Sequence, residues 1–164
     1  EVMEAKWLFG VQPSQIEVVV HPQSVIHSMV QFEDGAVKAQ LGMPDMRLPI
    51  QYALTWPERT EGPASPLDLL ACPPLTFYQP DLEAFPCLAL ALDCAKRGGT
   101  STAVLNGANE AAVALFLAGK IGFLDIPHLV ERALGQVETS ENPNLEDILW
   151  ADQAARRAVQ FNLR

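Results

Sequence analysis

Hydrophobic and polar residues alternate along residues 25–41, and this alternation predicts a β-hairpin with strands at about Val25–Phe32 and Ala36–Leu41. Asp34–Gly35 separates the two runs, and this dipeptide favours a two-residue type I′ turn. Such a turn would pair Phe32 with Val37. Because side chains alternate across a strand, one face would be almost wholly apolar, with Ile26, Ser28, Val30, Phe32, Val37, Ala39 and Leu41. The opposite face would be mostly polar, with His27, Met29, Gln31, Glu33, Ala36, Lys38 and Gln40.

Further elements are expected on both sides of the hairpin. Their positions are predicted from runs of apolar residues and from the positions of prolines. They are a helix over Glu1–Phe9, a third strand over Ile16–His21, a helix from Pro44 and Asp45 to about Trp56, and a proline-rich linker over 57–84 with a short strand at Leu75–Tyr78.

From Phe85 onward, apolar residues recur at helical spacing and predict four short helices. Gly98–Gly99 and Gly119 are expected to end the first two helices, and Asp125 and Asn144 to cap the third and fourth. Short connections between short helices predict a bundle over 85–164. The sequence therefore predicts an α+β fold in three parts, residues 1–56, 57–84 and 85–164.

Composition narrows the class of protein. Hydrophobic residues make up 49% of the 164 residues, so a folded core is expected. The net charge of −9 argues against nucleic acid and anionic membranes as partners. No apolar run approaches the ~20 residues that cross a bilayer. Cys72, Cys87 and Cys94 match no metal-binding spacing, which fits a reducing cytoplasm.

Several polar residues are candidates for chemistry, each with a structural alternative. His27 and His21 are either surface histidines or site residues, and their spacing matches no standard zinc pattern. Glu1 and Glu4 share a helix face, and on spacing alone they indicate a solvated acidic pair. A histidine-ligated hydrolase, which would hold stoichiometric zinc, is disfavoured by the same spacing.

Asn106, Asn109 and Glu110 share one face in the middle of a predicted helix. Asparagine is a poor residue for a helix interior, so we expect a specific hydrogen-bonding role. A polar network that ties two helices together is favoured over catalysis.

Longer segments carry a family resemblance. They are EVMEAKWLF at Glu1–Phe9, HPQSVIHSMV at His21–Val30, LGMPDMRLPI at Leu41–Ile50 and LNGANE at Leu105–Glu110. In order and spacing, the sequence resembles the 1-deoxy-D-xylulose 5-phosphate reductoisomerase family of the non-mevalonate isoprenoid pathway. The resemblance implies an upstream dinucleotide-binding domain and an Asp-x-Glu metal motif, and neither is in this sequence. We therefore expect the C-terminal portion of a longer enzyme, inactive by itself.

The resemblance also implies roles for three residues. Glu1 would complete a divalent-metal site for Mg²⁺ or Mn²⁺, and it counts as both a metal ligand and a catalytic candidate. His27 would support the active site as a second catalytic candidate. Met46 would lie near the nicotinamide of NADPH, although packing at a helix start explains it equally well.

The implied enzyme converts 1-deoxy-D-xylulose 5-phosphate, a phosphorylated sugar, to 2-C-methyl-D-erythritol 4-phosphate with hydride from NADPH. It would be a cytoplasmic homodimer joined through the sheet. The alternative is a non-catalytic interaction module, in which sheet edges and apolar hairpin faces favour self-association and the helical bundle acts as a scaffold.

Overall fold

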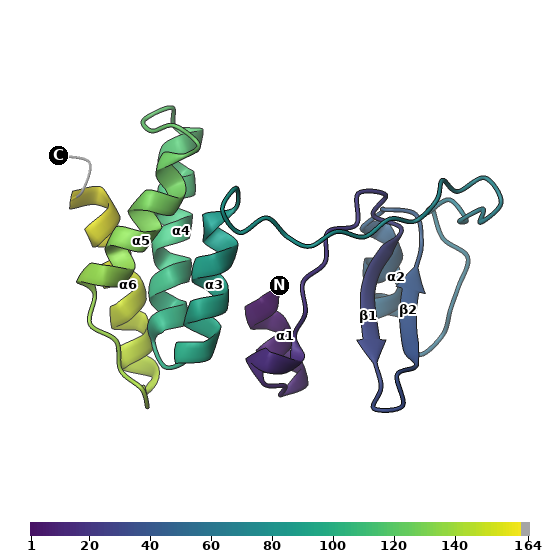
Figure 1. The fold of residues 1–164 in the computed structure, drawn as a ribbon, viewed down its shortest axis with the longest axis horizontal. Coiled ribbons are helices and arrows are strands. Elements are labelled where there is room, and N and C mark those ends of the chain that lie inside the picture. The colour runs from purple at the N-terminus through teal and green to yellow at the C-terminus, as the bar shows by residue number, and fades with distance from the viewer. Residues whose placement is uncertain (162–164) are drawn as a thin grey trace. The chain divides into compact units, whose positions relative to one another are not determined.

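The structure is a computed structural model that describes residues 1–161. Its elements, in chain order, are α1 (Val2–Phe9), the 3₁₀ turn η1 (Pro13–Gln15), β1 (Ile26–Gln31), β2 (Val37–Leu41), α2 (Arg47–Thr55), α3 (Pro86–Arg97), α4 (Ser101–Leu117), α5 (Asp125–Gln136) and α6 (Leu145–Phe161), as Figure 1 shows. The predicted α+β class is confirmed. Within residues 1–161, no helix is both long and apolar enough to cross a membrane.

The chain divides into two compact units. The helical unit comprises Glu1–Glu17 and the chain from Asp81 onward, and the hairpin unit comprises Val18–Pro80. α1 belongs to the helical unit, where Lys6 Nζ donates a hydrogen bond to the Ala95 carbonyl oxygen of α3 at 3.0 Å. The sequence grouped α1 with the hairpin instead. The predicted domain boundaries remain a prediction, because contacts within one chain do not define which parts fold independently.

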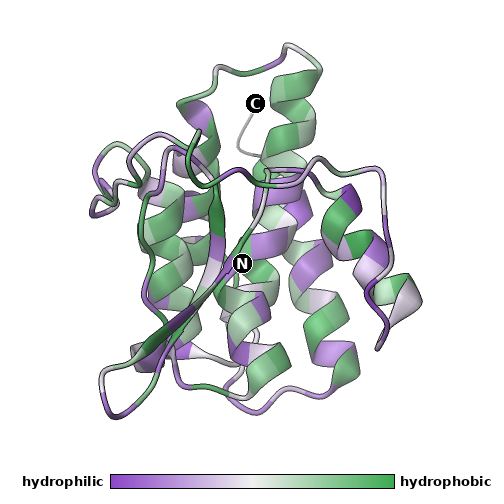
Figure 2. Ribbon diagram, turned by 90° about the vertical axis from the view of Figure 1, so that its right-hand side faces the viewer, coloured by the Kyte–Doolittle hydropathy of each residue, from purple (hydrophilic) through white to green (hydrophobic). Residues whose placement is uncertain are grey.

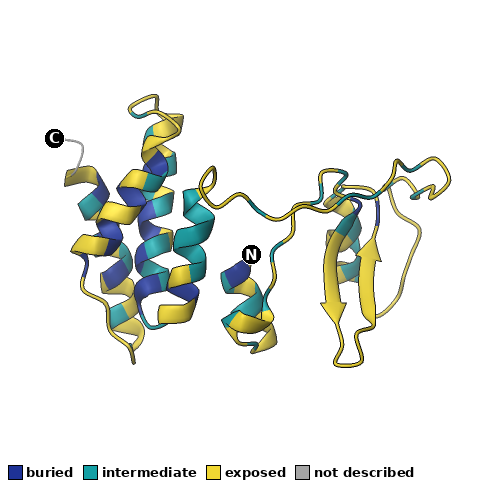
Figure 3. Cartoon of the chain, viewed as in Figure 1, coloured by how far each residue is buried: buried dark blue, intermediate teal, exposed yellow. Residues whose placement is uncertain are grey.

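Small residues form the core of the helical unit, between α4, α5 and α6. Figure 2 shows that the helices carry both hydrophobic and hydrophilic residues, and Figure 3 shows the buried residues of α4, α5 and α6. The fully buried set includes Val104, Ala108, Ala112, Val130, Ala133, Ala151, Ala155 and Val159. At Gly107 on α4, a Cβ atom would lie 2.7 Å from the Asp152 carbonyl oxygen of α6. Glycine therefore permits the close approach of these two helices.

Local side-chain hydrogen bonds set the ends of two helices. Asp147 N donates to Asn144 Oδ1 at 3.0 Å and Asn144 N donates to Asp147 Oδ2 at 2.9 Å, so the predicted Asn144 cap is confirmed. Asp125 lies inside α5, where Leu124 is the N-cap residue. The Asp125 carboxylate accepts a hydrogen bond from Gly122 N at 2.8 Å, so it holds the preceding turn rather than capping the helix as predicted.

The hairpin differs from its predicted register by one residue. Gln31 pairs with Val37 and Val30 with Lys38, and Phe32 N donates to the Ala36 carbonyl oxygen at 2.9 Å. The loop therefore contains Glu33–Gly35, with Gly35 at a φ of 83°. Asp34 Oδ1 accepts a hydrogen bond from Ala36 N, which favours this three-residue loop over the predicted type I′ turn. The predicted pairing of Phe32 with Val37 is wrong.

This register also overturns the predicted division into apolar and polar faces. Residues directly opposite each other share a face, so Val30 lies beside Lys38 and Met29 beside Ala39. Val30 is 58% exposed and Val37 is 54% exposed. Neither face of the two-stranded sheet is covered within the hairpin unit.

The predicted third strand over Ile16–His21 is wrong, and so is the short strand at Leu75–Tyr78. Each segment contributes one residue to an isolated bridge between Val20 and Tyr78. Proline explains why neither segment forms a longer strand. Pro22 lies just after Val20 and Pro80 just after Tyr78, and a proline cannot donate a backbone hydrogen bond to a neighbouring strand.

Candidate functional site

The hairpin base is the end of the hairpin opposite its loop, where Val25 and Gly42 lie. Both predicted site residues of the hairpin unit lie close to it in sequence. Val25 is only 6% exposed. Its carbonyl oxygen accepts a hydrogen bond from Gly42 N at 3.0 Å. His27 follows Val25 on β1, and Met46 follows Gly42 on the segment that enters α2.

His27 occupies an irregular position in β1. Ile26 pairs with Leu41 and Ser28 pairs with Gln40, so the register shifts across His27. His27 is thus the extra residue of a β-bulge, and its side chain is exposed. Bulges re-aim side chains and are frequent next to active sites. The alternation pattern of the sequence gave no sign of this bulge.

Met46 is the N-cap residue of α2, and its side chain is 72% exposed. The helix start is held by its neighbours Asp45 and Arg47 rather than by Met46. Arg47 Nε lies 2.9 and 3.0 Å from the two Asp45 carboxylate oxygens, and Arg47 N donates to Asp45 Oδ1 at 2.9 Å. The thioether of Met46 is therefore accessible to another group. A thioether can pack against the edge or face of a planar ring.

The hydrogen bonds from Arg47, through its side chain and then its backbone N–H, lower the pKa of Asp45. Replacing Arg47 with methionine is expected to raise the Asp45 pKa toward its ordinary value. Because the folded-state pKa is depressed, the pair stabilises α2 above the ordinary carboxyl pKa, and this contribution is lost as pH falls through the folded-state pKa. Carboxyl carbon NMR titration of both proteins measures the shift, and an unchanged Asp45 pKa would contradict this account.

Glu1, the predicted metal ligand, belongs to the helical unit. It is the N-cap residue of α1, and its carbonyl oxygen accepts a hydrogen bond from Ala5 N at 2.8 Å. The side chain is fully exposed and makes no capping hydrogen bond. Across residues 1–161, no group of three or more His, Cys, Asp or Glu residues could hold a metal ion. Glu1 therefore presents a single exposed carboxylate, which can supply oxygen to a metal ion.

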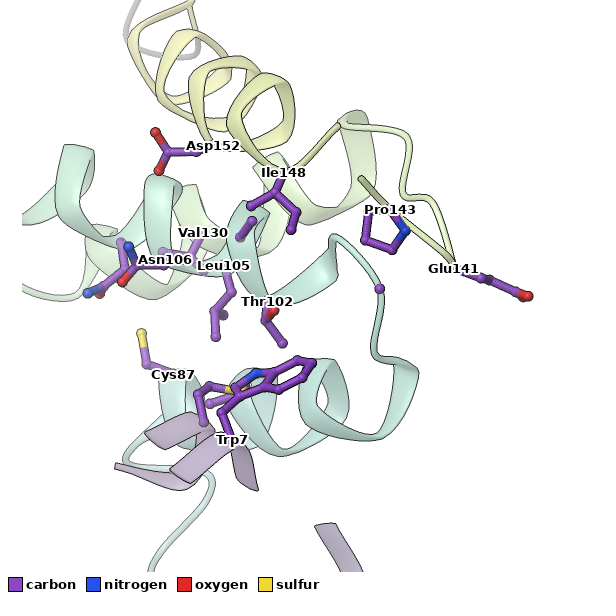
Figure 4. A pocket seen from close by; sticks show the side chains of 15 residues that line it. Trp7, Cys87, Thr102, Leu105, Asn106, Val130, Glu141, Pro143, Ile148 and Asp152 are labelled. Atoms are coloured by element: carbon purple, nitrogen blue, oxygen red, sulfur yellow. The ribbon is translucent and has the colours of Figure 1, made fainter. Parts of the chain in front are cut away.

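A pocket of about 780 Å³ opens among the helices of the helical unit, beside α1 (Figure 4). Trp7 of α1 lies on one side, and Ile148 and Asp152 of α6 lie on the other. Asn106 and Asn109 of α4 add carboxamide groups to a mainly apolar lining. This lining favours binding of an apolar group with a few polar atoms, not nucleophilic chemistry.

The predicted polar network between helices is confirmed for Glu110. Arg156 of α6 forms ion pairs with Glu110 of α4 and with Asp152 one turn earlier on α6. These hydrogen bonds, first from Asp152 and then from Glu110, raise the pKa of Arg156 further above its ordinary value. Asn106 and Asn109 line the pocket instead.

A group of residues missed by sequence reasoning ties the chain before β1 to the proline-rich segment. Gln23 and Thr76 form mutual hydrogen bonds, and His21 Nδ1 lies 2.8 Å from the Thr76 carbonyl oxygen. The sequence marks His21 as a candidate site residue, but Gln23 and Thr76 lie in segments without a periodic pattern. The sequence around Gln23, His21–Ser24, gives no indication that Thr76 is its partner.

Comparison with known proteins identifies the family to which the chain belongs. The family model described as the DXP reductoisomerase C-terminal domain matches residues 41–158. The chain belongs to the 1-deoxy-D-xylulose 5-phosphate reductoisomerase family. Among curated reductoisomerases, that of Acetivibrio thermocellus is 54% identical over 160 residues, which cover 98% of this chain and 42% of the relative. That of Bacteroides fragilis is 58% identical over 160 residues, covering 98% and 41%. The chain thus spans about two-fifths of the length of these relatives.

Solved reductoisomerase structures share the fold. One, from Zymomonas mobilis in complex with NADPH, is 46% identical with a TM-score of 0.90, covering 99% of this chain and 43% of that chain. Another reductoisomerase, in complex with NADPH, fosmidomycin and magnesium, is 42% identical with a TM-score of 0.90, covering 99% and 42%. The predicted resemblance to the reductoisomerase family is therefore confirmed.

Proposed function

We propose that this chain is part of an NADPH-dependent and divalent-metal-dependent reductoisomerase of isoprenoid biosynthesis. The full-length enzyme would convert 1-deoxy-D-xylulose 5-phosphate to 2-C-methyl-D-erythritol 4-phosphate. The family match over residues 41–158 carries the proposal. It is supported by curated relatives of that name at 54–58% identity, and by neighbouring structures whose proteins hold NADPH or magnesium.

Three residues of this chain would serve the reaction. Glu1 would give one carboxylate ligand to Mg²⁺ or Mn²⁺, with the remaining ligands supplied by other parts of the enzyme. The metal, when bound, would polarise the substrate carbonyl. His27, re-aimed by its bulge, would support the site, and the exposed thioether of Met46 would contact the nicotinamide end of NADPH.

The proposed enzyme acts in the cytoplasm as a homodimer joined through the hairpin. Exposed apolar side chains on both strands, among them Met29, Val30, Val37 and Leu41, fit such an interface. The alternative, a non-catalytic interaction module, would use the same side chains. Self-association therefore does not discriminate between the two functions, whereas catalysis does.

The test is turnover by the full-length protein. Oxidation of NADPH should require both 1-deoxy-D-xylulose 5-phosphate and Mg²⁺ or Mn²⁺, and should stop when a chelator removes the metal. The branched product should appear in amounts equal to the NADPH consumed. A folded full-length protein that consumes no NADPH with substrate and either metal would refute the proposed function.

The chain of 164 residues, by itself, is expected to bind neither NADPH nor the sugar phosphate tightly. It contains no glycine-rich dinucleotide motif, and Met46 offers a single apolar contact. Isothermal titration calorimetry of the purified chain measures both affinities. Tight NADPH binding by this chain would show that its residues carry more of the cofactor site than proposed.

A further inference from the structure

We infer that His21, Gln23 and Thr76 form a positioning clamp for the hairpin base, and so for His27 and Met46. The catalytic consequence rests on the proposed function, whereas the structural coupling does not. All the residues involved belong to the hairpin unit.

The first part of the clamp is a reciprocal pair of hydrogen bonds across 53 positions of sequence. Gln23 Nε2 donates to Thr76 Oγ1 at 2.8 Å, and Thr76 N donates to Gln23 Oε1 at 3.1 Å. One carboxamide thus satisfies both the hydroxyl and the backbone N–H of Thr76. Such a pair fixes both the position and the orientation of the proline-rich segment against the chain that leads into β1.

The second part is the ring of His21. Its Nδ1 lies 2.8 Å from the Thr76 carbonyl oxygen, and because a carbonyl oxygen only accepts, Nδ1 carries the proton. The ring stacks on Phe77 with centroids 4.7 Å apart and planes inclined by 16°. Both backbone hydrogen bonds of the Val20–Tyr78 bridge measure 2.9 Å and extend the contact.

A strained turn connects the clamp to the hairpin. Ser24 has a φ of 51°, and Ser24 N donates to the His21 carbonyl oxygen at 3.0 Å. A non-glycine residue with such a φ is strained and persists only where its surroundings hold it. His21 and Gln23, just before Ser24 in the chain, supply that restraint through their contacts with Thr76.

Contacts after Ser24 connect the clamp to the segments that carry His27 and Met46. Val25 follows at once, and its carbonyl oxygen accepts the hydrogen bond from Gly42 N. At Gly42, a Cβ atom would lie 2.9 Å from Leu48 Cδ2, so the base packs tightly on the first turn of α2. The bulge at His27 begins directly after Ile26, and Met46 stands before the same turn of α2. Loosening the clamp should therefore displace both residues.

The first test replaces Thr76 with valine in the full-length enzyme. Valine keeps the shape and the backbone hydrogen bonds but removes the hydroxyl. The loss of one or two hydrogen bonds should raise the KM for NADPH about five- to tenfold, with kcat changed less than the KM. Thr76→Ser restores the hydroxyl and should return the KM to near wild type. Thr139→Val, at an exposed position of the helical unit, is the matched control.

Two substitutions of His21 separate its hydrogen bond from its stacking. His21→Asn can keep a donor close to the position of Nδ1, whereas His21→Phe keeps an aromatic ring on Phe77 without the donor. If the clamp acts through the hydrogen bond, the phenylalanine variant should resemble Thr76→Val and the asparagine variant should resemble wild type. The opposite order would overturn the role given to Nδ1.

Hydrogen exchange in the full-length protein tests the coupling without any need for turnover. In Thr76→Val, exchange of the amides in segment 42–47 should accelerate about tenfold, as expected for the loss of roughly 1.4 kcal/mol of local stability. Thr139→Val should leave them unchanged. Faster exchange confined to residues 75–78 would overturn the clamp. If wild type shows no turnover, the proposed function fails, and the exchange result still decides whether the clamp exists.

Discussion

Changing Glu1 to glutamine is expected to lower kcat/KM of the full-length enzyme for the sugar phosphate about a hundredfold or more. Glutamine keeps the size of the side chain but replaces an anionic oxygen ligand with a neutral one, which a hard divalent cation binds much less well. A hundredfold loss corresponds to ~2.7 kcal/mol of transition-state stabilisation. NADPH oxidation, measured across a range of Mg²⁺ or Mn²⁺ concentrations, should show the largest defect at low metal and partial recovery at high metal.

The matched control for this substitution is Glu131→Gln, which removes one carboxylate from an exposed position on α5. Its kcat/KM should stay within about twofold of wild type, because exposed charges far from a site contribute little. If Glu1→Gln and Glu131→Gln have equal activity at limiting metal, Glu1 is not a ligand. Its exposed position at the start of α1 would then indicate only a solvated carboxylate.

Changing Gly99 to alanine is expected to destabilise the helical unit by about 3 kcal/mol or more. Gly99 has a φ of 55°, and its Cβ atom would lie 2.0 Å from the Ser140 carbonyl oxygen. Ser140 cannot move aside easily, because that oxygen accepts a hydrogen bond from Thr100 N at 2.9 Å and Ser140 N donates to Thr100 Oγ1 at 2.9 Å. Urea unfolding, followed through the helical signal, measures the change in the free energy of unfolding.

Gly10→Ala separates backbone strain from steric clash. Gly10, also in the helical unit, adopts the left-handed conformation with a φ of 63° and a ψ of 26°, and a Cβ atom there would meet nothing within 4 Å. Its replacement should cost only about 1 kcal/mol, the usual penalty for alanine in the left-handed region. The difference between the two variants isolates the contact with Ser140. Equal losses of stability would show that the loop carrying Ser140 yields, and that the close approach does not constrain position 99.

The helices were predictable because their signals are local. The spacing of apolar residues predicts where α3 to α6 lie in the sequence. The signal for the start of α6 is the hydrogen-bonded pair Asn144 and Asp147, which are only three positions apart. The hairpin was predictable as an element but not in its register. Asp34–Gly35 supports both a two-residue and a three-residue loop, and one residue of difference exchanges the faces of a whole strand.

The candidate site was less accessible to sequence reasoning. Gln23 and Thr76 are polar residues in segments without periodicity, and nothing in a single sequence pairs residues 53 positions apart. The bulge at His27 was hidden for the same reason, since it depends on which residues of β2 oppose Ile26 and Ser28. The roles of Glu1, His27 and Met46 came from family resemblance rather than physical pattern. They remain predictions that the variants described above can test.

The loop Glu33–Gly35 and the root of the hairpin at Val25 and Gly42 lie at opposite ends of the paired strands, with the bulge at His27 near the root. Strand length beyond the irregularity can change in matched pairs without reorienting Val25 or Gly42. The loop at Glu33–Gly35 is therefore a suitable attachment point for a fluorescent label or a short peptide tag. A reporter placed there would follow association of the protein while leaving the segment that leads into α2 undisturbed.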